Sequence, residues 1–458
     1  MKTNFTPLWG GLLLLFGVGS ASAQTVANTF AASTNHSVSI RPDGSLWAWG
    51  LNYDGQLGNG TTDCSSAPVQ VAAADAPGAQ WAQVAAGTAH TLALTTDGRL
   101  YAWGSNSDGQ LGDGTKTAHL RPVAVRFPAS ATGATWKQVA AGTSHSLALA
   151  ADGRLYAWGN NNHGELGNGS STDRATPVEV ALPHSAANTT WAYVAAGNHH
   201  TLALTANGHL YAWGGNDYGQ LGNGTEMTAL LPTPIGLTKK LAGLRWNHVA
   251  AGRFHTLAVA SNGQLYTWGS NRFGQLGEDH DAKHSLPEPM RLAPALATIA
   301  WKQVAAGDAH SLALSADGRV MAWGNNCAGQ LGDGSTERQL KPVEVVALSG
   351  ATPGAWARVV SGGFHTLATT KDGQFYAWGA NKHGQVGDGT TADRNRPLAQ
   401  DPLLTSVSQV AAEKSAAPAK RTAFPVEEWG LNDDRLMNEL PESPSFLIRL
   451  EPKNEAPY

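Results

Sequence analysis

A Trp-Gly pair that recurs at an almost constant spacing constrains this chain more than any other feature. The first interval is 54 residues and the other five are 55 residues, and the pairs begin at Trp49, Trp103, Trp158, Trp213, Trp268, Trp323 and Trp378. A fixed period of this length is typical of a modular array, in which each unit buries its apolar face against its neighbours. We therefore expect residues common to all copies to hold the fold, and residues that differ between copies to carry function.

Each copy has the pattern of four short strands. In copy three, the segment from Trp136 to Gly142 predicts an inner strand, whose small Ala and Gly side chains suit a crowded centre. Asp152-Gly153 separates two apolar segments, which is the strongest short-range hairpin signal. Residues 176–180 (Thr-Pro-Val-Glu-Val) fit a shorter outer strand, because Pro is tolerated at a sheet edge. Seven copies of this unit predict an all-β fold, a seven-bladed β-propeller.

The two ends of the chain depart from the repeat. Lys2, an apolar run over residues 8–18 and the small residues 21–23 predict a signal peptide over residues 1–23, and hence a secreted or periplasmic protein without a membrane span after cleavage. The repeats fill residues 24–413. Residues 414–458 begin rich in Ala, Lys and Pro and become acidic, which predicts a linker and a largely mobile tail.

The sequence does not determine which segment closes the ring. Residues 25–33 occupy the inner-strand position of copy one, but residues 407–413 also resemble an inner strand. Both segments cannot fill the same position.

The composition argues against several classes of function. The chain carries 31 basic and 35 acidic residues, without the basic excess expected of a nucleic-acid-binding surface. Cys64 and Cys327 lie in copies one and six, so we predict two free thiols, since a disulfide needs Cα atoms within about 7 Å. We find no Cys-x2-Cys spacing, and we predict neither a metal site nor a cofactor. We also expect a monomer.

One histidine stands at the same place in every copy, and in copies two to seven it follows the motif Gly-x-x. These residues are His36, His90, His145, His200, His255, His310 and His365. A general base is usually a single residue, so seven equivalent histidines predict buried structural groups bonded to the backbone of the adjacent strand. The same reasoning assigns the repeated Trp residues to the scaffold. We find no Gly-x-Ser-x-Gly, phosphate-binding or His-Glu-x-x-His motif, and we predict that the protein is not an enzyme.

Two connections in each copy vary in sequence. Successive antiparallel strands reverse direction, so the first and third connections of every blade should open on one face and the Asp-Gly turns on the other. Arg and aromatic residues are enriched in interface hot spots. We therefore predict a partner-binding surface made of His199, Tyr218, Arg253, Phe254, Arg272, Phe273, Phe364, Lys382 and His383.

The repeat motifs resemble those of the regulator of chromosome condensation repeat family. The resemblance is carried by Ala86-Gly87-x-x-His90, Asp97-Gly98, Tyr101-Ala-Trp103-Gly104 and Asn106-x-x-Gly109-Gln-Leu-Gly112 and their equivalents, and it covers roughly residues 25–413. Copy one has Ser33 where other copies have Gly, and copy seven has Val386 where others have Leu. We expect neither change to affect the fold.

The resemblance implies several activities. The family includes secreted bacterial propellers that inhibit enzymes by protein–protein contact, and we expect this chain to be an exported, non-catalytic scaffold that binds another protein. The alternative is a guanine-nucleotide exchange factor-like regulator of a small GTPase, which the signal peptide would separate from its partner. Ultraviolet sensing would use a Trp inserted in Gly-x-x-His, and no insert here contains one. A glycan-active enzyme has no motif to support it.

Overall fold

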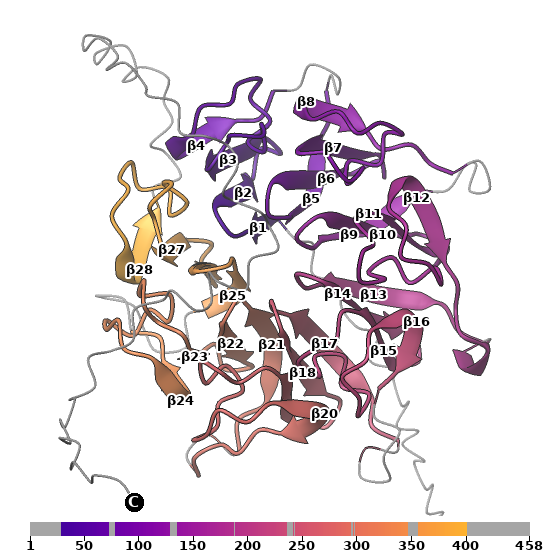
Figure 1. The fold of residues 1–458 in the computed structure, drawn as a ribbon. Coiled ribbons are helices and arrows are strands. Elements are labelled where there is room, and N and C mark those ends of the chain that lie inside the picture. The colour runs from indigo at the N-terminus through magenta and orange to yellow at the C-terminus, as the bar shows by residue number, and fades with distance from the viewer. Residues whose placement is uncertain are drawn as a thin grey trace, which may run out of the picture. The chain divides into compact units, whose positions relative to one another are not determined.

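The chain folds into seven antiparallel sheets of four strands each, arranged as the blades of a propeller (Figure 1). The computed structural model describes residues 29–72, 78–128, 135–186, 188–235, 241, 243–294, 296, 298–346 and 356–400. Within this part of the chain, the helical content is one short 3-10 helix, η2 (His184–Ala186). The predicted all-β, seven-bladed fold is confirmed.

Each blade takes its four strands in sequence order, from the centre outward (Figure 1). The innermost strands are β1 (Phe30–Ala32), β5 (Trp81–Ala86), β9 (Trp136–Ala141), β13 (Trp191–Ala196), β17 (Trp246–Ala251), β21 (Trp301–Ala306) and β25 (Trp356–Ser361). The second strands are β2 (His36–Ile40), β6 (His90–Thr95), β10 (His145–Ala150), β14 (His200–Thr205), β18 (His255–Ala260), β22 (His310–Ser315) and β26 (His365–Thr370).

The outer half of each blade consists of a short third strand and a longer fourth strand. The third strands are β3 (Leu46–Gly50), β7 (Leu100–Gly104), β11 (Leu155–Gly159), β15 (Leu210–Gly214), β19 (Leu265–Gly269), β23 (Val320–Gly324) and β27 (Phe375–Gly379). The fourth strands are β4 (Ser65–Gln70), β8 (His119–Ala124), β12 (Arg174–Val180), β16 (Ala229–Pro234), β20 (His284–Pro289), β24 (Gln339–Glu344) and β28 (Arg394–Gln400).

The predicted hairpin turns are present, but the prediction of a shorter outer strand is wrong. In blade 3, Gly153 of the Asp-Gly pair has a φ of 85°, the left-handed conformation that Gly adopts without a steric penalty. Strand β12 has 7 residues, and its partner β11 has 5 residues. A fourth strand pairs along one edge only, so a Pro on its free edge, such as Pro177, interrupts no ladder bond and does not shorten the strand.

The N-terminal segment fills the inner position of blade 1. Strand β1 pairs with β2, with Phe30 opposite Ser39, so blade 1 is continuous in sequence like the other six blades. Blade 7 meets blade 1 directly, because the Gly363 N–H donates to the Ser33 carbonyl (2.9 Å). Residues 407–413, the competing candidate, lie outside the described residues.

The hydrophobic core is divided among the junctions between blades. At the junction of blades 3 and 4, Leu147, Leu155 and Leu166 pack with Trp191 and Trp213 of the next blade. Trp213 has no solvent-exposed surface. Each blade thus buries its apolar face against its neighbour, as the period predicts, and the interactions between blades hold the ring together.

Other expectations concern the ends and the cysteines. Cys64 and Cys327 are free and exposed, as predicted. The predicted signal peptide and C-terminal tail lie outside the described residues. Among the residues that are described, we find no helix with the length and apolar character needed to cross a bilayer.

Candidate functional site

The repeated histidines join neighbouring blades through side-chain hydroxyl groups. Each ring is buried, and each Nε2 lies 2.8–3.2 Å from a Ser or Thr hydroxyl of the next blade. The bond between His365 and Ser37 (2.8 Å) connects blade 7 to blade 1 and so completes the ring. The prediction that these histidines bond to backbone groups is therefore wrong, because their ring nitrogens reach across the junction rather than along their own sheet.

The hydroxyl groups determine which ring nitrogen carries the proton. The Thr256 hydroxyl, which faces His200, donates to the Gln220 carbonyl (2.8 Å), so its oxygen accepts from the Nε2–H of His200 (3.2 Å). The Nδ1 atom of His200 has no hydrogen-bond partner within the described chain. Burial, together with the neighbouring histidines, lowers the pKa of His200 from 6.5 to about 3. The ring is neutral at physiological pH.

The repeated Trp residues complete this inter-blade network, which we define as the repeated His, the Ser or Thr hydroxyl, the repeated Trp, and the carbonyl that joins them. The carbonyl of Glu165 accepts from the hydroxyl of Thr201 (2.9 Å) and from the indole Nε1–H of Trp213 (2.8 Å). Equivalent carbonyls accept the Trp indole at the other six junctions. The network satisfies the buried hydroxyl and indole groups and the Nε2 atoms of the histidines, so the repeated residues serve the structure of the ring.

The first and third connections of the blades share one face, which we call the variable face. The third connection of blade 4 meets the first connection of blade 5, where the rings of Tyr218 and Phe254 are 4.7 Å apart. The same relation holds between blades 3 and 4, where the rings of His163 and His199 are 4.9 Å apart. Contacts across the blade junctions therefore support the assignment of both connections to one face.

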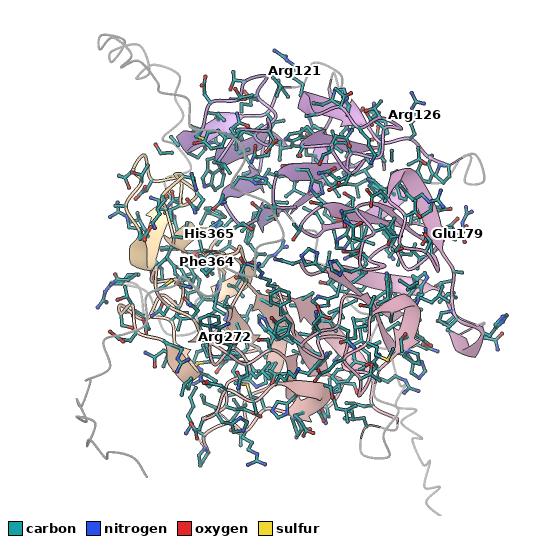
Figure 2. All side chains as sticks on the ribbon, viewed as in Figure 1. Arg121, Arg126, Glu179, Arg272, Phe364 and His365 are labelled. Atoms are coloured by element: carbon teal, nitrogen blue, oxygen red, sulfur yellow. The ribbon has the colours of Figure 1, made fainter. Side chains whose placement is uncertain are left out.

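The nine predicted surface residues are all at least partly exposed on this face, but they do not form one cluster. Arg253 lies over the Phe254 ring (5.1 Å), and Arg272 lies over the Phe273 ring (5.9 Å), so blades 4 and 5 carry two pairs of cationic and aromatic side chains. Phe364, Lys382 and His383 belong to blade 7, two blades further round the ring, and His199 lies at the junction of blades 3 and 4. Figure 2 shows Arg272 and Phe364 in relation to Arg121 and Glu179 on outer strands. Whether these residues bind a partner stays a prediction.

A small cavity opens at the centre, at the inner ends of the seven blades. Its volume is about 100 Å³, and it is lined largely by Ala, Gly and Thr residues of the innermost strands and first connections. Asp308 also lines it, and burial raises the pKa of this carboxyl group, whereas the positive charge of Arg253 acts in the opposite direction. The Nε of Arg253 is buried without a hydrogen-bond partner among the described residues. Arg253 thus lies between the exposed aromatic side chains of the variable face and the central cavity.

Several exposed apolar residues were missed by the sequence reasoning. Tyr53, Met227 and Leu231 are 67%, 76% and 57% exposed. Tyr53 and Met227 belong to third connections, and Leu231 lies near the start of β16, close to Gly169 of the neighbouring blade. An alignment of the seven copies could have indicated that Leu231 is exposed, because copies two and seven have Arg at its position. Met227 and Leu231 lie outside the two-residue inserts that the sequence comparison used, whereas Tyr53 lies within the insert of blade 1 and was not among the residues selected from blades 3, 4, 5 and 7.

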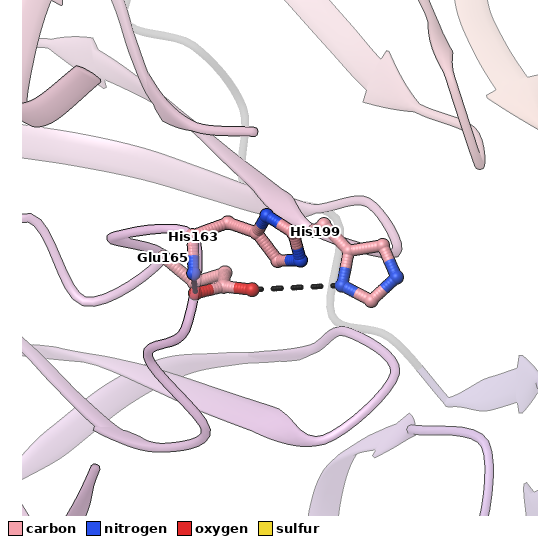
Figure 3. A group of neighbouring side chains, drawn as sticks. All are labelled: His163, Glu165 and His199. Carbon is pink, nitrogen blue, oxygen red and sulfur yellow. Dashed lines mark hydrogen bonds and ion pairs between the residues drawn. The ribbon is translucent and has the colours of Figure 1, made fainter. Parts of the chain in front are cut away.

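Two groups of side chains bring together atoms that could bind a metal ion, although the sequence predicted none. His163, Glu165 and His199 form the first group, and Glu278, His280 and His284 form the second. In the first group, Glu165 Oε1 lies 3.5 Å from Nδ1 of His199, and the three side chains lie next to one another (Figure 3). The residues of the first group come from two blades, so a search for closely spaced ligands along the chain could not find them, whereas those of the second group lie within seven residues of one another in blade 5.

Comparison with known proteins relates the chain to a single family. The family described as RCC1-like domain matches residues 176–443, and the Regulator of chromosome condensation (RCC1) repeat matches residues 43–94 and 97–149. The ultraviolet-B receptor UVR8 of Arabidopsis thaliana is 33% identical over 415 residues, which covers 88% of this chain and 90% of the receptor. The human E3 ubiquitin-protein ligase HERC2 is 34% identical over 331 residues, but the match spans only 6% of that protein.

Solved structures show the same architecture. Prp20p from Saccharomyces cerevisiae, described with its binding properties to Gsp1p and histones, is 26% identical with a TM-score of 0.67, over 78% of this chain and 86% of that one. Human WBSCR16 has a TM-score of 0.68 at 24% identity, over 78% of this chain and 93% of that one, which shows a shared fold. The seven blades, the repeat motifs and the matches over most of its length show that this chain belongs to the regulator of chromosome condensation (RCC1) repeat family.

Proposed function

We propose that this protein is an exported, non-catalytic scaffold that binds another protein through its variable face. The observation that carries the proposal is the group formed by Tyr218, Arg253, Phe254, Arg272 and Phe273 on blades 4 and 5. Arg and large aromatic side chains supply much of the binding energy in protein interfaces. Arg253 follows Gly252, which lines the central cavity, so a partner bound at Arg253 would lie beside the opening of that cavity.

Arg253 is the residue that we expect to lie at the centre of the interface. Its Nε is buried and has no hydrogen-bond partner among the described residues, and a buried unsatisfied donor in a native protein calls for an explanation. A carboxylate or carbonyl group of a partner would satisfy it. Met227 and Leu231 would extend the contact with exposed apolar surface on blade 4.

Binding to proteins is also consistent with what is described for a relative. Prp20p is described with binding to Gsp1p and histones, and the chain resembles it over 78% of its length. This resemblance keeps guanine-nucleotide exchange on a small GTPase as the second candidate. Stimulated nucleotide release from a GTPase by the purified chain would favour that candidate over an exported scaffold.

The test is capture of partners from the culture medium and the periplasmic fraction, with the purified ring as bait. We expect Arg253→Ala, Phe254→Ala and Phe273→Ala together to abolish capture without altering the far-ultraviolet circular dichroism spectrum. The matched control is Arg99→Ala, Arg154→Ala and Arg319→Ala, at the Asp-Gly turns of the opposite face, which should capture normally. Capture that is equal for the two variants would overturn the proposal.

The proposed export is tested separately by the N-terminus of the natural protein. Mass spectrometry of the mature chain should find it outside the cytoplasm and beginning at Gln24. An intact Met1 on a cytoplasmic protein would contradict export, but it would leave the binding surface to be judged by the capture experiment.

A further inference from the structure

We propose that His163, Glu165 and His199 form a binding site for one divalent transition-metal ion of the zinc type. His163 and Glu165 belong to the third connection of blade 3, and His199 belongs to the first connection of blade 4. The ion would therefore bridge two blades on the variable face. This proposal does not depend on the partner-binding function, although His199 belongs to both surfaces.

Glu165 carries a negative charge that the other copies lack at this position and that its hydrogen bond within the repeat does not require. The other copies have Gln at this position, namely Gln56, Gln110, Gln220, Gln275, Gln330 and Gln385. In those copies the side-chain Oε1 accepts a backbone N–H two residues earlier, as Gln220 does from Tyr218 (3.0 Å). Glu165 makes the same bond, because its Oε2 accepts the N–H of His163 (2.9 Å). The second oxygen, Oε1, replaces an amide nitrogen and adds a negative charge.

This negative charge is buried. The Glu165 side chain is only 1% exposed. Its Oε1 lies 3.5 Å from Nδ1 of His199. A buried carboxylate is costly unless it is paired with a cation, and a metal ion would provide that pairing.

Two imidazole rings lie beside the carboxylate (Figure 3). The rings of His163 and His199 are 4.9 Å apart, and the potential ligand atoms of the three side chains all lie within 4.8 Å of one another. Ligand atoms bound to Zn²⁺ at about 2.0–2.2 Å are at most about 4 Å apart. Small side-chain rotations would therefore bring all three onto one ion.

The chemistry of the ligands determines the class of ion. Two histidines and one glutamate form a known three-residue ligand set for Zn²⁺, with a water in the fourth position. Imidazole also favours Zn²⁺, Cu²⁺ and Ni²⁺ over Mg²⁺ and Ca²⁺, which prefer oxygen ligands.

The second group of possible ligands supports a metal site less well. The Glu278–His284 pair (2.7 Å) occupies the same place in blade 5 as the Asp113–His119 pair (3.0 Å) in blade 2, so it is a variant of a repeated contact. The remaining member, His280, is 58% exposed. Glu165, by contrast, has no counterpart carboxylate in any other copy.

The test is calorimetric titration of the metal-free, full-length protein with Zn²⁺, together with the absorption spectrum of bound Co²⁺. We expect Glu165→Gln, which restores the residue found in the other copies, to weaken Zn²⁺ binding by more than about 10–100-fold, the loss caused by removing even an outer-shell partner of a metal ligand. His199→Ala should have a similar effect. Both variants should also lose the Co²⁺ ligand-field bands.

Two controls make the outcome decisive. His383 is the counterpart of His163 in blade 7, but Gln385 and Asn35 stand where Glu165 and His199 would be. His383→Ala should leave Zn²⁺ binding unchanged. Glu278→Gln should also leave Zn²⁺ binding unchanged. Glu165→Gln should melt at a temperature no lower than that of the metal-free wild type, since Gln fits this site in the other copies and carries no buried charge. Zn²⁺ binding that Glu165→Gln leaves unchanged, or a wild-type chain that binds no Zn²⁺, would overturn the proposal.

Discussion

The inter-blade network and the variable face are built from neighbouring residues but follow opposite rules. In the motif Gly-x-x-His, His255 is buried and bonded to Ser311 of the next blade, whereas Arg253 and Phe254 in the same motif are partly exposed. The network recurs at every junction because each junction buries the same kinds of polar group, and only the residue that supplies the hydroxyl shifts, from a second strand to Ser361 of β25 in the case of His310. The face is variable because its side chains meet solvent and need not match a neighbouring blade. Stability and recognition are therefore encoded at adjacent positions of one motif.

The largest expected effect comes from acid, which should act through the buried histidines of the network. Burial lowers the pKa of His90, His255 and His310 from 6.5 to about 3, as it does for other repeated histidines. In the unfolded chain these groups take up protons as the pH falls below about 6.5, while the folded chain does not until about 3. The stability is thus complete above pH 6.5 and is lost on acidification, by about 1.4 kcal/mol per pH unit for each histidine.

Denaturant unfolding followed at several pH values between about 7 and about 4 measures this loss. His255→Gln, which keeps a donor near the position of Nε2, should reduce the slope because it removes one titrating group. A free energy of unfolding that stays constant over this range would contradict neutral, buried histidines in the network.

The next largest effect is expected from Trp213→Ala, which removes a buried indole from the junction of blades 3 and 4. Trp213 has no exposed surface, and its Nε1–H donates to the Glu165 carbonyl. We expect the free energy of unfolding to fall by about 3–5 kcal/mol. Chemical denaturation measures the loss. The exposed aromatic Tyr53 is the control, and Tyr53→Ala should cost far less; equal losses would remove the distinction between network and face.

A smaller effect is expected from Gly112→Ala, at a place where the chain passes close to an indole. Gly112 has a φ of +69°, and an added Cβ would lie 2.6 Å from Nε1 of Trp158. The backbone conformation alone should cost about 1–3 kcal/mol, and the contact adds to it. Gly78→Ala is the matched control, since Gly78 has a φ of +73° with nothing within 4 Å of the added Cβ. Gly112→Ala should melt at a lower temperature than Gly78→Ala. Identical melting temperatures would show that the Trp158 indole moves aside at little energetic cost, which would contradict the prediction.

The smallest effect on stability is expected from changes on the variable face. Phe254→Ala and Phe273→Ala should each change the free energy of unfolding by no more than about 0.5 kcal/mol, because their side chains are partly exposed and lie outside the network. Denaturation of the double variant measures the sum. A loss comparable to that of Trp213→Ala would show that these residues are part of the scaffold.

The fold can be predicted well from the sequence because the same hairpin signal occurs in all seven copies. The sequence also places the first and third connections on one face, since that follows from antiparallel pairing alone. It does not predict the partner of His200, because the contact with Thr256 depends on how two sheets pack. The meeting of Glu165 and His199 is hidden for the same reason. Sequence patterns predict the strands and turns within a blade. The side-chain contacts between blades depend on how the sheets pack, which only the three-dimensional structure shows.

Hydrogen–deuterium exchange of the ring, alone and with a captured partner, tests the central claim most directly. Partner binding should slow exchange in the first and third connections of blades 4 and 5, within residues 214–228, 252–255 and 269–283. Exchange at the Asp-Gly turns, such as residues 97–99 and 317–319, should stay the same. Protection at those turns, with the variable face unaffected, would contradict the account.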